Sequence, residues 1–250
     1  MPHLNTSMTL LVAACLVYVL ASVAAAQEAH SWAYSGTTGP DHWSEVSAVC
    51  GFGRVQSPID IAKPRHSKLG AIHFSYRASP LVVIDNGHTI QVNYVQGSYL
   101  MWEGRTFELK QFHFHHQSET TINGEHAPME LHLVHQDNKG NLLVLAVMLR
   151  EGDANSTIGR VWNNIGAKQG EANAPSGASI DATQLLPGEH NYYTFPGSLT
   201  TPPCTENVTW VVLTEPVTVS EEQVEVFAKL YPGNARPVQP LNGRKVLVSK

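Results

Sequence analysis

Two short stretches of the chain place histidines at a spacing that suits a metal ion. From Gln111 to His115 polar and aromatic residues alternate, so an extended strand would point His113 and His115 to one face and the phenylalanines to the other. A third imidazole, His132, follows downstream in Glu130-Leu131-His132. Three neutral imidazoles with one open coordination position are a common arrangement for catalytic zinc. We therefore predict a zinc site formed by His113, His115 and His132.

Polar residues beside these histidines suit the second nitrogen of each imidazole. Gln111 and Glu130 each lie two residues before a predicted ligand and on its side of the strand, where a metal-bound imidazole needs an acceptor. The alternative is an ordinary polar pair on a solvated sheet face.

Asn123-Gly124 is a hairpin-type turn signal that would bring His132 back beside the first pair. His116 and His135 should point away from the ligands and serve structure.

Short apolar runs separated by Gly and Pro predict the strands that position these residues. The segment 142–149 is apolar on both faces and is expected to be a central, covered strand. Helical spacing from Ile158 to Ile165 and a capping box at Ser220 and Gln223 predict two helices, the second ending before Pro232. Other strands are expected at 81–84, 89–94, 109–115, 129–135 and 208–213. The fold class is mixed α/β with dominant β, built as a large, mostly antiparallel sheet with short peripheral helices.

Composition limits the number of domains and the classes of partner. The chain has 250 residues, of which 42% are hydrophobic and 15% charged, which is sufficient for one sizeable core and a single domain. The net charge is −5, and no basic run occurs anywhere in the chain. A nucleic-acid partner is therefore not expected.

The N-terminal segment predicts export from the cytoplasm. Residues 8–26 are almost entirely apolar and end in three alanines, which suits a signal peptide over residues 1–26 and a mature domain over residues 27–250. A retained membrane anchor is the alternative, because the stretch is long enough to span a bilayer. Cleavage would remove Cys15 and leave Cys50 and Cys204, which we expect to form a disulfide in a periplasmic or extracellular compartment, with two unrelated buried thiols as the alternative.

Taken together, these motifs resemble the alpha-class carbonic anhydrases, in particular the secreted bacterial type. The resemblance covers nearly the whole predicted mature chain, and His-x-His, Glu-x-His and Thr-Thr-Pro-Pro in this order make it specific. It is carried by Trp32-Ala33-Tyr34, Gly39-Pro40, Trp43, Gln56-Ser57-Pro58-Ile59-Asp60, Asn86-Gly87-His88, the histidine strands and Ser198-Leu199-Thr200-Thr201-Pro202-Pro203. Cys50 and Cys204 also match the position of the disulfide in secreted bacterial members.

The resemblance implies reversible hydration of carbon dioxide to bicarbonate and a proton, with Zn²⁺ as the cofactor that supplies hydroxide at neutral pH. It gives the Thr200 hydroxyl and Glu119 the role of orienting that nucleophile, and His88 the role of proton shuttle. Tyr34, Asn86 and Gln91 would order the waters on the proton path. The apolar substrate pocket would be formed by Val134, Val144, Leu199, Thr201, Val208 and Trp210.

The resemblance also implies sulfonamide and anion inhibitors, and it admits a homodimer. The chain departs from the family at Thr120 and Phe195, where His and Tyr are usual and help to hold the equivalent of Glu130. Two other functions remain open at this level. The chain could be a non-catalytic carbonic-anhydrase-like binding domain, or a secreted zinc esterase, since the same hydroxide attacks an activated acyl carbon.

Overall fold

The two histidine-bearing stretches are neighbouring strands of one large sheet. In the computed structural model, which describes residues 31–249, β8 (Arg105–His115) pairs antiparallel with β11 (Met129–Gln136). The register sets His132 directly opposite His113. Directly opposed residues project their side chains to the same face of a sheet, so this pairing brings the predicted ligands together.

The sheet that contains β8 and β11 has thirteen strands within the described residues. Its other members are β2 (Arg65–His66), β3 (His73–Ser75), β5 (Val82–Asp85), β6 (Ile90–Asn93), β7 (Tyr99–Trp102), β12 (Leu142–Glu151), β13 (Ala172–Asn173), β15 (Tyr192–Ser198), β16 (Glu206–Leu213), β17 (Val217–Val219) and β18 (Leu247–Val248). The main path runs β13-β5-β6-β8-β11-β12-β16-β15-β18-β2. Most pairs are antiparallel, whereas β12–β16, β12–β17 and β18–β2 are parallel. The predicted large, mostly antiparallel sheet is confirmed.

Two small sheets complete the strand structure of residues 31–249. One combines β1 (Asp60–Ile61), β9 (Thr121–Ile122) and β10 (Glu125–His126), and the other combines β4 (Ser79–Pro80) and β14 (Ser179–Ile180). The predicted Asn123-Gly124 turn connects β9 to β10, and both residues have positive φ, 52° and 84°. This hairpin lies between β8 and β11 in the chain and reverses its direction before His132.

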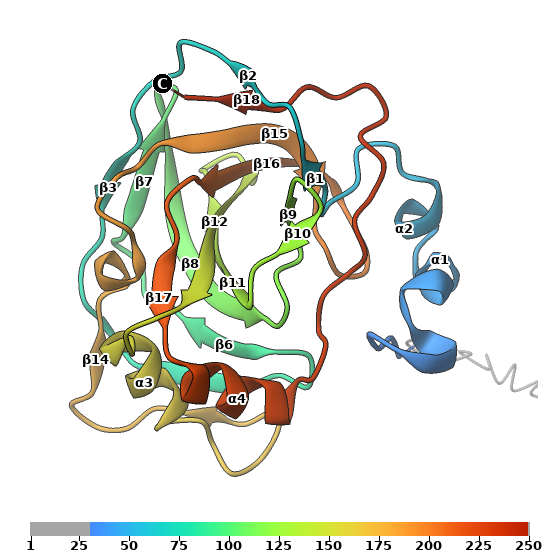
Figure 1. Ribbon diagram of the computed structural model, residues 1–250. Helices are drawn as coiled ribbons and strands as arrows, with labels where there is room; N and C mark the ends of the chain where they lie inside the picture. Colours follow the sequence, from blue (N-terminus) through green and yellow to red (C-terminus); the bar gives the residue numbers. More distant parts are fainter. Residues whose placement is uncertain (1–30, 250) are drawn as a thin grey trace, which may run out of the picture.

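The helices are short and lie outside the sheet, as predicted (Figure 1). They are α1 (Trp43–Val46), α2 (Ala48–Phe52), α3 (Ser156–Trp162) and α4 (Glu221–Leu230), with 3-10 turns at Gly36–Thr38, Pro40–His42 and Ala182–Leu185. The capping box at Ser220 and Gln223 is present at the start of α4. Figure 1 shows α1 and α2 at one side of the sheet, and α3 beside α4 at one end.

The central strand β12 separates two hydrophobic clusters. Leu143, Leu145, Val147 and Leu149 pack into the larger cluster together with residues of β5, β6 and β8. The intervening residues, Val144 among them, pack into a smaller cluster on the opposite face. The prediction that residues 142–149 are covered on both faces is therefore confirmed.

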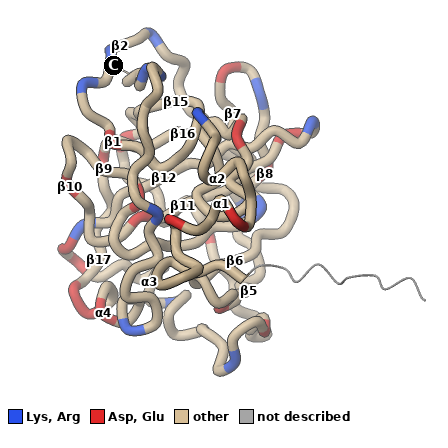
Figure 2. The backbone as a smooth tube through the Cα atoms, turned by 90° about the vertical axis from the view of Figure 1, so that its right-hand side faces the viewer, with Lys and Arg blue, Asp and Glu red and all other residues tan. Residues whose placement is uncertain are grey.

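The predicted signal segment, residues 1–26, lies outside the described residues. In the part of the chain that is described, none of the helices is both long and apolar enough to cross a membrane. Figure 2 shows Lys and Arg interspersed with Asp and Glu over the face that it presents.

Candidate active site

Each predicted ligand imidazole uses one nitrogen in a contact with the protein. His113 Nδ1 lies 2.8 Å from Gln111 Oε1, and His115 Nδ1 lies 2.7 Å from the main-chain oxygen of Asn234. His132 Nε2 lies 3.1 Å from a Glu130 carboxylate oxygen, although this contact departs from hydrogen-bond geometry. These contacts leave Nε2 of His113, Nε2 of His115 and Nδ1 of His132 free to face one another.

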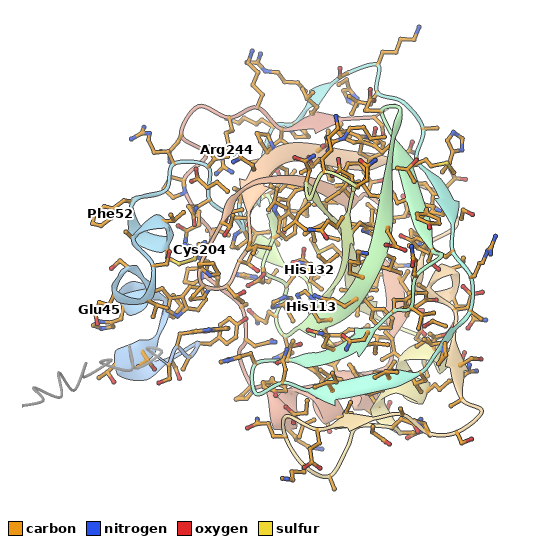
Figure 3. All side chains as sticks on the ribbon, turned by 180° about the vertical axis from the view of Figure 1, so that it is seen from behind. Glu45, Phe52, His113, His132, Cys204 and Arg244 are labelled. Carbon is orange, nitrogen blue, oxygen red and sulfur yellow. A yellow bond between two sulfur atoms is a disulfide. The ribbon has the colours of Figure 1, made fainter. Side chains whose placement is uncertain are left out.

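The three histidines fit a divalent metal ion such as zinc. One ligand nitrogen from each lies within 4.8 Å of the others, and Figure 3 shows His113 and His132 side by side in the interior. Burial lowers the pKa of all three imidazoles, most strongly for His113 and His132, so they are neutral and hold a free lone pair. His115 Nε2 is buried and has no hydrogen-bond partner among the described residues. A bound cation would satisfy that atom.

Glu119 lies beside the histidines and is fully buried. Its Oε1 accepts a hydrogen bond of 2.8 Å from the Arg236 main-chain N–H, and its Oε2 lies 3.5 Å from His115 Nε2. Burial raises the pKa of Glu119 to about 8, and the Arg236 N–H and the Thr200 hydroxyl oppose that rise. A cation at the histidines would also lower the pKa of Glu119, because a positive charge favours the carboxylate form. The structure thus brings Thr200, Glu119 and the imidazoles into one cluster.

His88 lies in the turn between β5 and β6. Its ring stacks on Trp32, with centroids 3.7 Å apart and planes within 10°. Partial burial lowers the pKa of His88, which leaves the imidazole neutral and able to accept a proton at neutral pH. The main-chain N–H groups of His88 and Thr89 both donate to Asn86 Oδ1, at 3.0 and 2.9 Å. Asn86 therefore shapes this turn.

The other residues of the predicted proton path lie close to the same turn. Asn86 Nδ2 lies 3.4 Å from Gln91 Oε1, and β6 places Gln91 opposite His113. Tyr34 contacts Trp32 edge-on, with ring centroids 5.4 Å apart. Burial, Glu119 and Tyr231 raise the pKa of Tyr34 well above its usual value, so its hydroxyl remains protonated. Gln91 thus links Asn86 of the turn to the strand position opposite His113, and Tyr34 reaches His88 through Trp32.

The predicted apolar wall comes together on one face of the sheet. The register pairs Val144 with Val134 on one side and with Trp210 on the other, so these residues adjoin across three strands. The Trp210 ring contacts the His132 ring edge-on at 5.0 Å. Val144, Val208 and Trp210 belong to the smaller hydrophobic cluster, and the partly buried Val134 and Leu199 pack against it. Thr201 follows Thr200 in the loop after β15.

Gly197 allows the chain to enter that loop. A Cβ atom at this position would lie 2.1 Å from Ser57 Oγ and 2.6 Å from Trp210 Cδ1, both far inside contact distance. Trp210 Nε1 donates to the Ser198 main-chain oxygen at 2.9 Å. Only glycine therefore lets β15 lie against Trp210 at this point, two residues before Leu199.

The predicted disulfide joins Cys50 in α2 to Cys204 in the loop that carries Thr200. The Cys204 main-chain N–H donates to the Thr201 main-chain oxygen at 2.8 Å. Buried Arg236 donates to the Cys50 main-chain oxygen at 2.8 Å and also supplies the N–H that reaches Glu119. The disulfide is therefore connected to Thr201, which follows Thr200, and through Arg236 to Glu119.

Replacing Cys50 and Cys204 together by alanine should lower the free energy of unfolding. The bond closes a loop of 154 residues, and the chain-entropy treatment gives a loss of up to about 5 kcal/mol. Urea unfolding measures this loss, and reduction of the unaltered chain by dithiothreitol should reproduce it. An unchanged midpoint in the double variant would show that the bond contributes nothing to stability.

Of the two departures from the family pattern, Thr120 contacts Glu130 and Phe195 packs against Trp210. The Thr120 main-chain N–H donates to Glu130 Oε2 at 2.8 Å, whereas the buried Thr120 hydroxyl has no hydrogen-bond partner in residues 31–249. Phe195 is buried and stacks parallel to Trp210, with centroids 6.2 Å apart. Glu130 is thus held by a main-chain donor, and Phe195 contributes apolar packing to the smaller cluster.

Sequence reasoning missed two buried residues that contact the site. Asn234 and Arg236 follow α4, contact His115 and Glu119, and lie in no recognisable motif. His135, predicted to serve structure, lies with its Nε2 2.7 Å from the Tyr76 hydroxyl, away from the cluster. The partner Tyr76 was also not foreseen, because it comes from a distant part of the chain.

Comparison with known proteins agrees with this geometry. The profile of the eukaryotic-type carbonic anhydrases matches residues 38–250. A carbonic anhydrase of Nostoc is 44% identical over 225 residues (87% of this chain, 85% of the relative), and one of Neisseria gonorrhoeae is 42% identical over 255 residues (99% and 100%). The solved alpha-carbonic anhydrase of Thermovibrio ammonificans, a complex with the inhibitor sulfanilamide, superposes with a TM-score of 0.83 at 44% identity (88% of this chain, 99% of that one). This chain belongs to the alpha-carbonic anhydrase family.

Proposed function

We propose that this chain catalyses the reversible hydration of carbon dioxide, with Zn²⁺ held by His113, His115 and His132. The observation that carries the proposal is the cluster of three neutral imidazoles beside Glu119, in a chain of the alpha-carbonic anhydrase family. When bound, zinc lowers the pKa of a coordinated water to near 7 and so supplies a nucleophile at neutral pH.

The protein's part in the reaction begins with orientation of the ligands. Gln111 and the Asn234 main-chain oxygen hold the outer nitrogens of His113 and His115 and so set the direction of these rings, and Glu130 lies 3.1 Å from the outer nitrogen of His132. In our proposal the Thr200 hydroxyl donates its hydrogen to Glu119, so that only lone pairs of the hydroxyl oxygen point toward the metal side. The hydroxyl oxygen then accepts a hydrogen bond from the nucleophile and so aligns the nucleophile with the substrate.

The substrate and the product proton need different surroundings. Carbon dioxide has no charge and no hydrogen-bond donor, so an apolar wall that includes Val144, Leu199 and Trp210 suits it. The proton leaves by way of waters beside Tyr34, Asn86 and Gln91 and is accepted by His88. The lowered pKa of His88 favours its neutral form, which can accept the proton.

Replacing His88 by alanine should slow turnover at least about tenfold in weakly buffered solution, because proton export loses its acceptor. Added imidazole should restore the rate. Stopped-flow hydration at low and high buffer concentration measures both effects. An unchanged rate in weak buffer would contradict the shuttle assignment.

The function is tested by stopped-flow hydration before and after removal of zinc by a chelator. Fast hydration that disappears with the metal and returns on zinc addition supports the proposal. Stoichiometric zinc with hydration at the uncatalysed rate would instead favour a binding domain, and ester hydrolysis far above hydration would favour a zinc esterase.

Further parts of the proposal concern location and inhibitors. We assign residues 1–26 as a cleaved signal peptide and residues 27–250 as the catalytic domain, in the periplasm or outside the cell. The Cys50–Cys204 disulfide supports an oxidising compartment. The sulfanilamide complex of the Thermovibrio ammonificans enzyme supports sulfonamide binding here.

A further inference from the structure

One buried residue, Asn234, joins two parts of the site that are distant in the sequence. It is 1% exposed and lies four residues after the end of α4. Its side-chain Nδ2 donates to the main-chain oxygens of His88 and Phe114, each at 3.0 Å. Its Oδ1 accepts from the His116 main-chain N–H at 2.8 Å. The side chain therefore connects the turn of the predicted proton shuttle to the end of β8.

The main chain of Asn234 adds a second set of contacts to the same strand. Its N–H donates to the His116 main-chain oxygen at 3.1 Å, and its own oxygen accepts from His115 Nδ1. His115 is one of the predicted zinc ligands. The position of that oxygen depends on the position of the residue as a whole, which the side-chain hydrogen bonds fix.

The chemistry of the partners requires an asparagine. Two carbonyl oxygens need donors and one N–H needs an acceptor, and a short primary amide offers both at this distance. The same partners settle the orientation of the amide, because a flipped group would place its oxygen against two oxygens. Aspartate has nearly the same shape but lacks the two donors.

We propose that Asn234 is a positioning residue that couples the His88 turn to the zinc ligand His115. The inference rests on the proposed function for the roles of His88 and His115. Other contacts also hold the turn, among them the Tyr231 hydroxyl, which bonds Asp85, and Thr89 Oγ1, which donates to the Phe114 oxygen at 2.5 Å. Neither of these reaches a ligand imidazole. Asn234 alone among these residues contacts both the turn and the ligand.

The test compares Asn234→Ala with Tyr231→Phe in the zinc-loaded protein. Asn234→Ala should speed amide hydrogen exchange over residues 86–90 about tenfold, as expected for the loss of one or two buried hydrogen bonds. It should also speed zinc release to a chelator about tenfold, since residues behind metal ligands commonly have effects of this size. Tyr231→Phe should speed exchange in the turn and leave zinc release unchanged.

Thr194→Val serves as the matched control, because it removes a buried hydrogen bond to the Trp210 main-chain oxygen elsewhere in the sheet. It should alter neither exchange in the turn nor zinc release. If Asn234→Ala stays within twofold of the unaltered protein in both measurements, or if Thr194→Val reproduces its effects, the inference is wrong. A further test uses the unaltered protein and so does not depend on the folding of a variant. The side-chain amide protons of Asn234 should exchange slowly with solvent, and fast exchange would overturn the assignment.

These readouts separate the inference from the proposed function. Exchange in the turn and zinc release report on Asn234 even if the protein does not hydrate carbon dioxide. Conversely, confirmed hydration together with unaffected exchange and zinc release would leave the function standing and remove Asn234 from it. If both hold, Asn234→Ala should also lower turnover in weak buffer, with rescue by imidazole.

Discussion

Replacing His132 by alanine should lower the rate of carbon dioxide hydration by at least about 1,000-fold. Enzymes commonly accelerate their reactions by more than this factor, and the acceleration proposed here depends on the metal. Two remaining imidazoles provide too few ligands to hold zinc tightly. The bound zinc should therefore fall well below one ion per chain. Stopped-flow hydration and metal analysis on the same preparation measure both effects.

His126→Ala is the matched control for that experiment. His126 lies in the same stretch of the chain, is exposed and contacts the Ser118 main-chain oxygen, outside the metal cluster. Its loss should leave zinc content and hydration unchanged. Loss of the His132 imidazole leaves buried Glu130 without its neighbour and could disturb the fold. Circular dichroism therefore has to show that His132→Ala is folded. A folded His132→Ala protein that keeps one zinc and full activity would falsify the assignment of the ligands.

Replacing Thr200 by valine should lower kcat/KM for hydration about 100-fold, with zinc content unchanged. Valine keeps the shape of the side chain but removes the hydroxyl that orients the nucleophile, and the loss of one preorganised hydrogen-bonding group commonly costs this much. The burial of Thr200 beside Glu119 makes it difficult for water to replace the hydroxyl.

Thr209→Val provides the comparison, because Thr209 is a half-buried threonine of β16. It should change kcat/KM by less than twofold. Loss of zinc from Thr200→Val would assign Thr200 to metal retention instead of substrate alignment. Equal activity of the two variants would remove the hydroxyl from the mechanism.

The sequence predicted the parts of the site that depend on local pattern. Alternation in residues 111–115 correctly placed His113 and His115 on the face opposite the phenylalanines, which are fully buried in the larger cluster. The Asn123-Gly124 turn and the Ser220 capping box also require only near neighbours, and both are present. Local rules suffice wherever the deciding contacts lie within a few residues of one another.

Contacts made at long range could not be predicted in the same way. Asn234 reaches His88 and His115 only because the segment after α4 returns to the end of β8, and no periodicity marks such a return. The role of Arg236 likewise depends on the simultaneous positions of Cys50 and Glu119. Even the departure at Thr120 could be judged only once its main-chain N–H was seen to reach Glu130.

The strand β12 imposes a constraint on the future evolution of this chain. Residues 143–149 are buried on both faces, and of these only Val144 has a role in the chemistry proposed above, as part of the apolar wall. Successive residues of this segment pack into opposite clusters, so a substituted side chain that fits one cluster lies between neighbours that fit the other. A shift of the strand by one residue would move every side chain to the opposite cluster. Random mutagenesis should therefore find this segment among the least tolerant in the protein, and libraries that seek new activity should leave it unchanged.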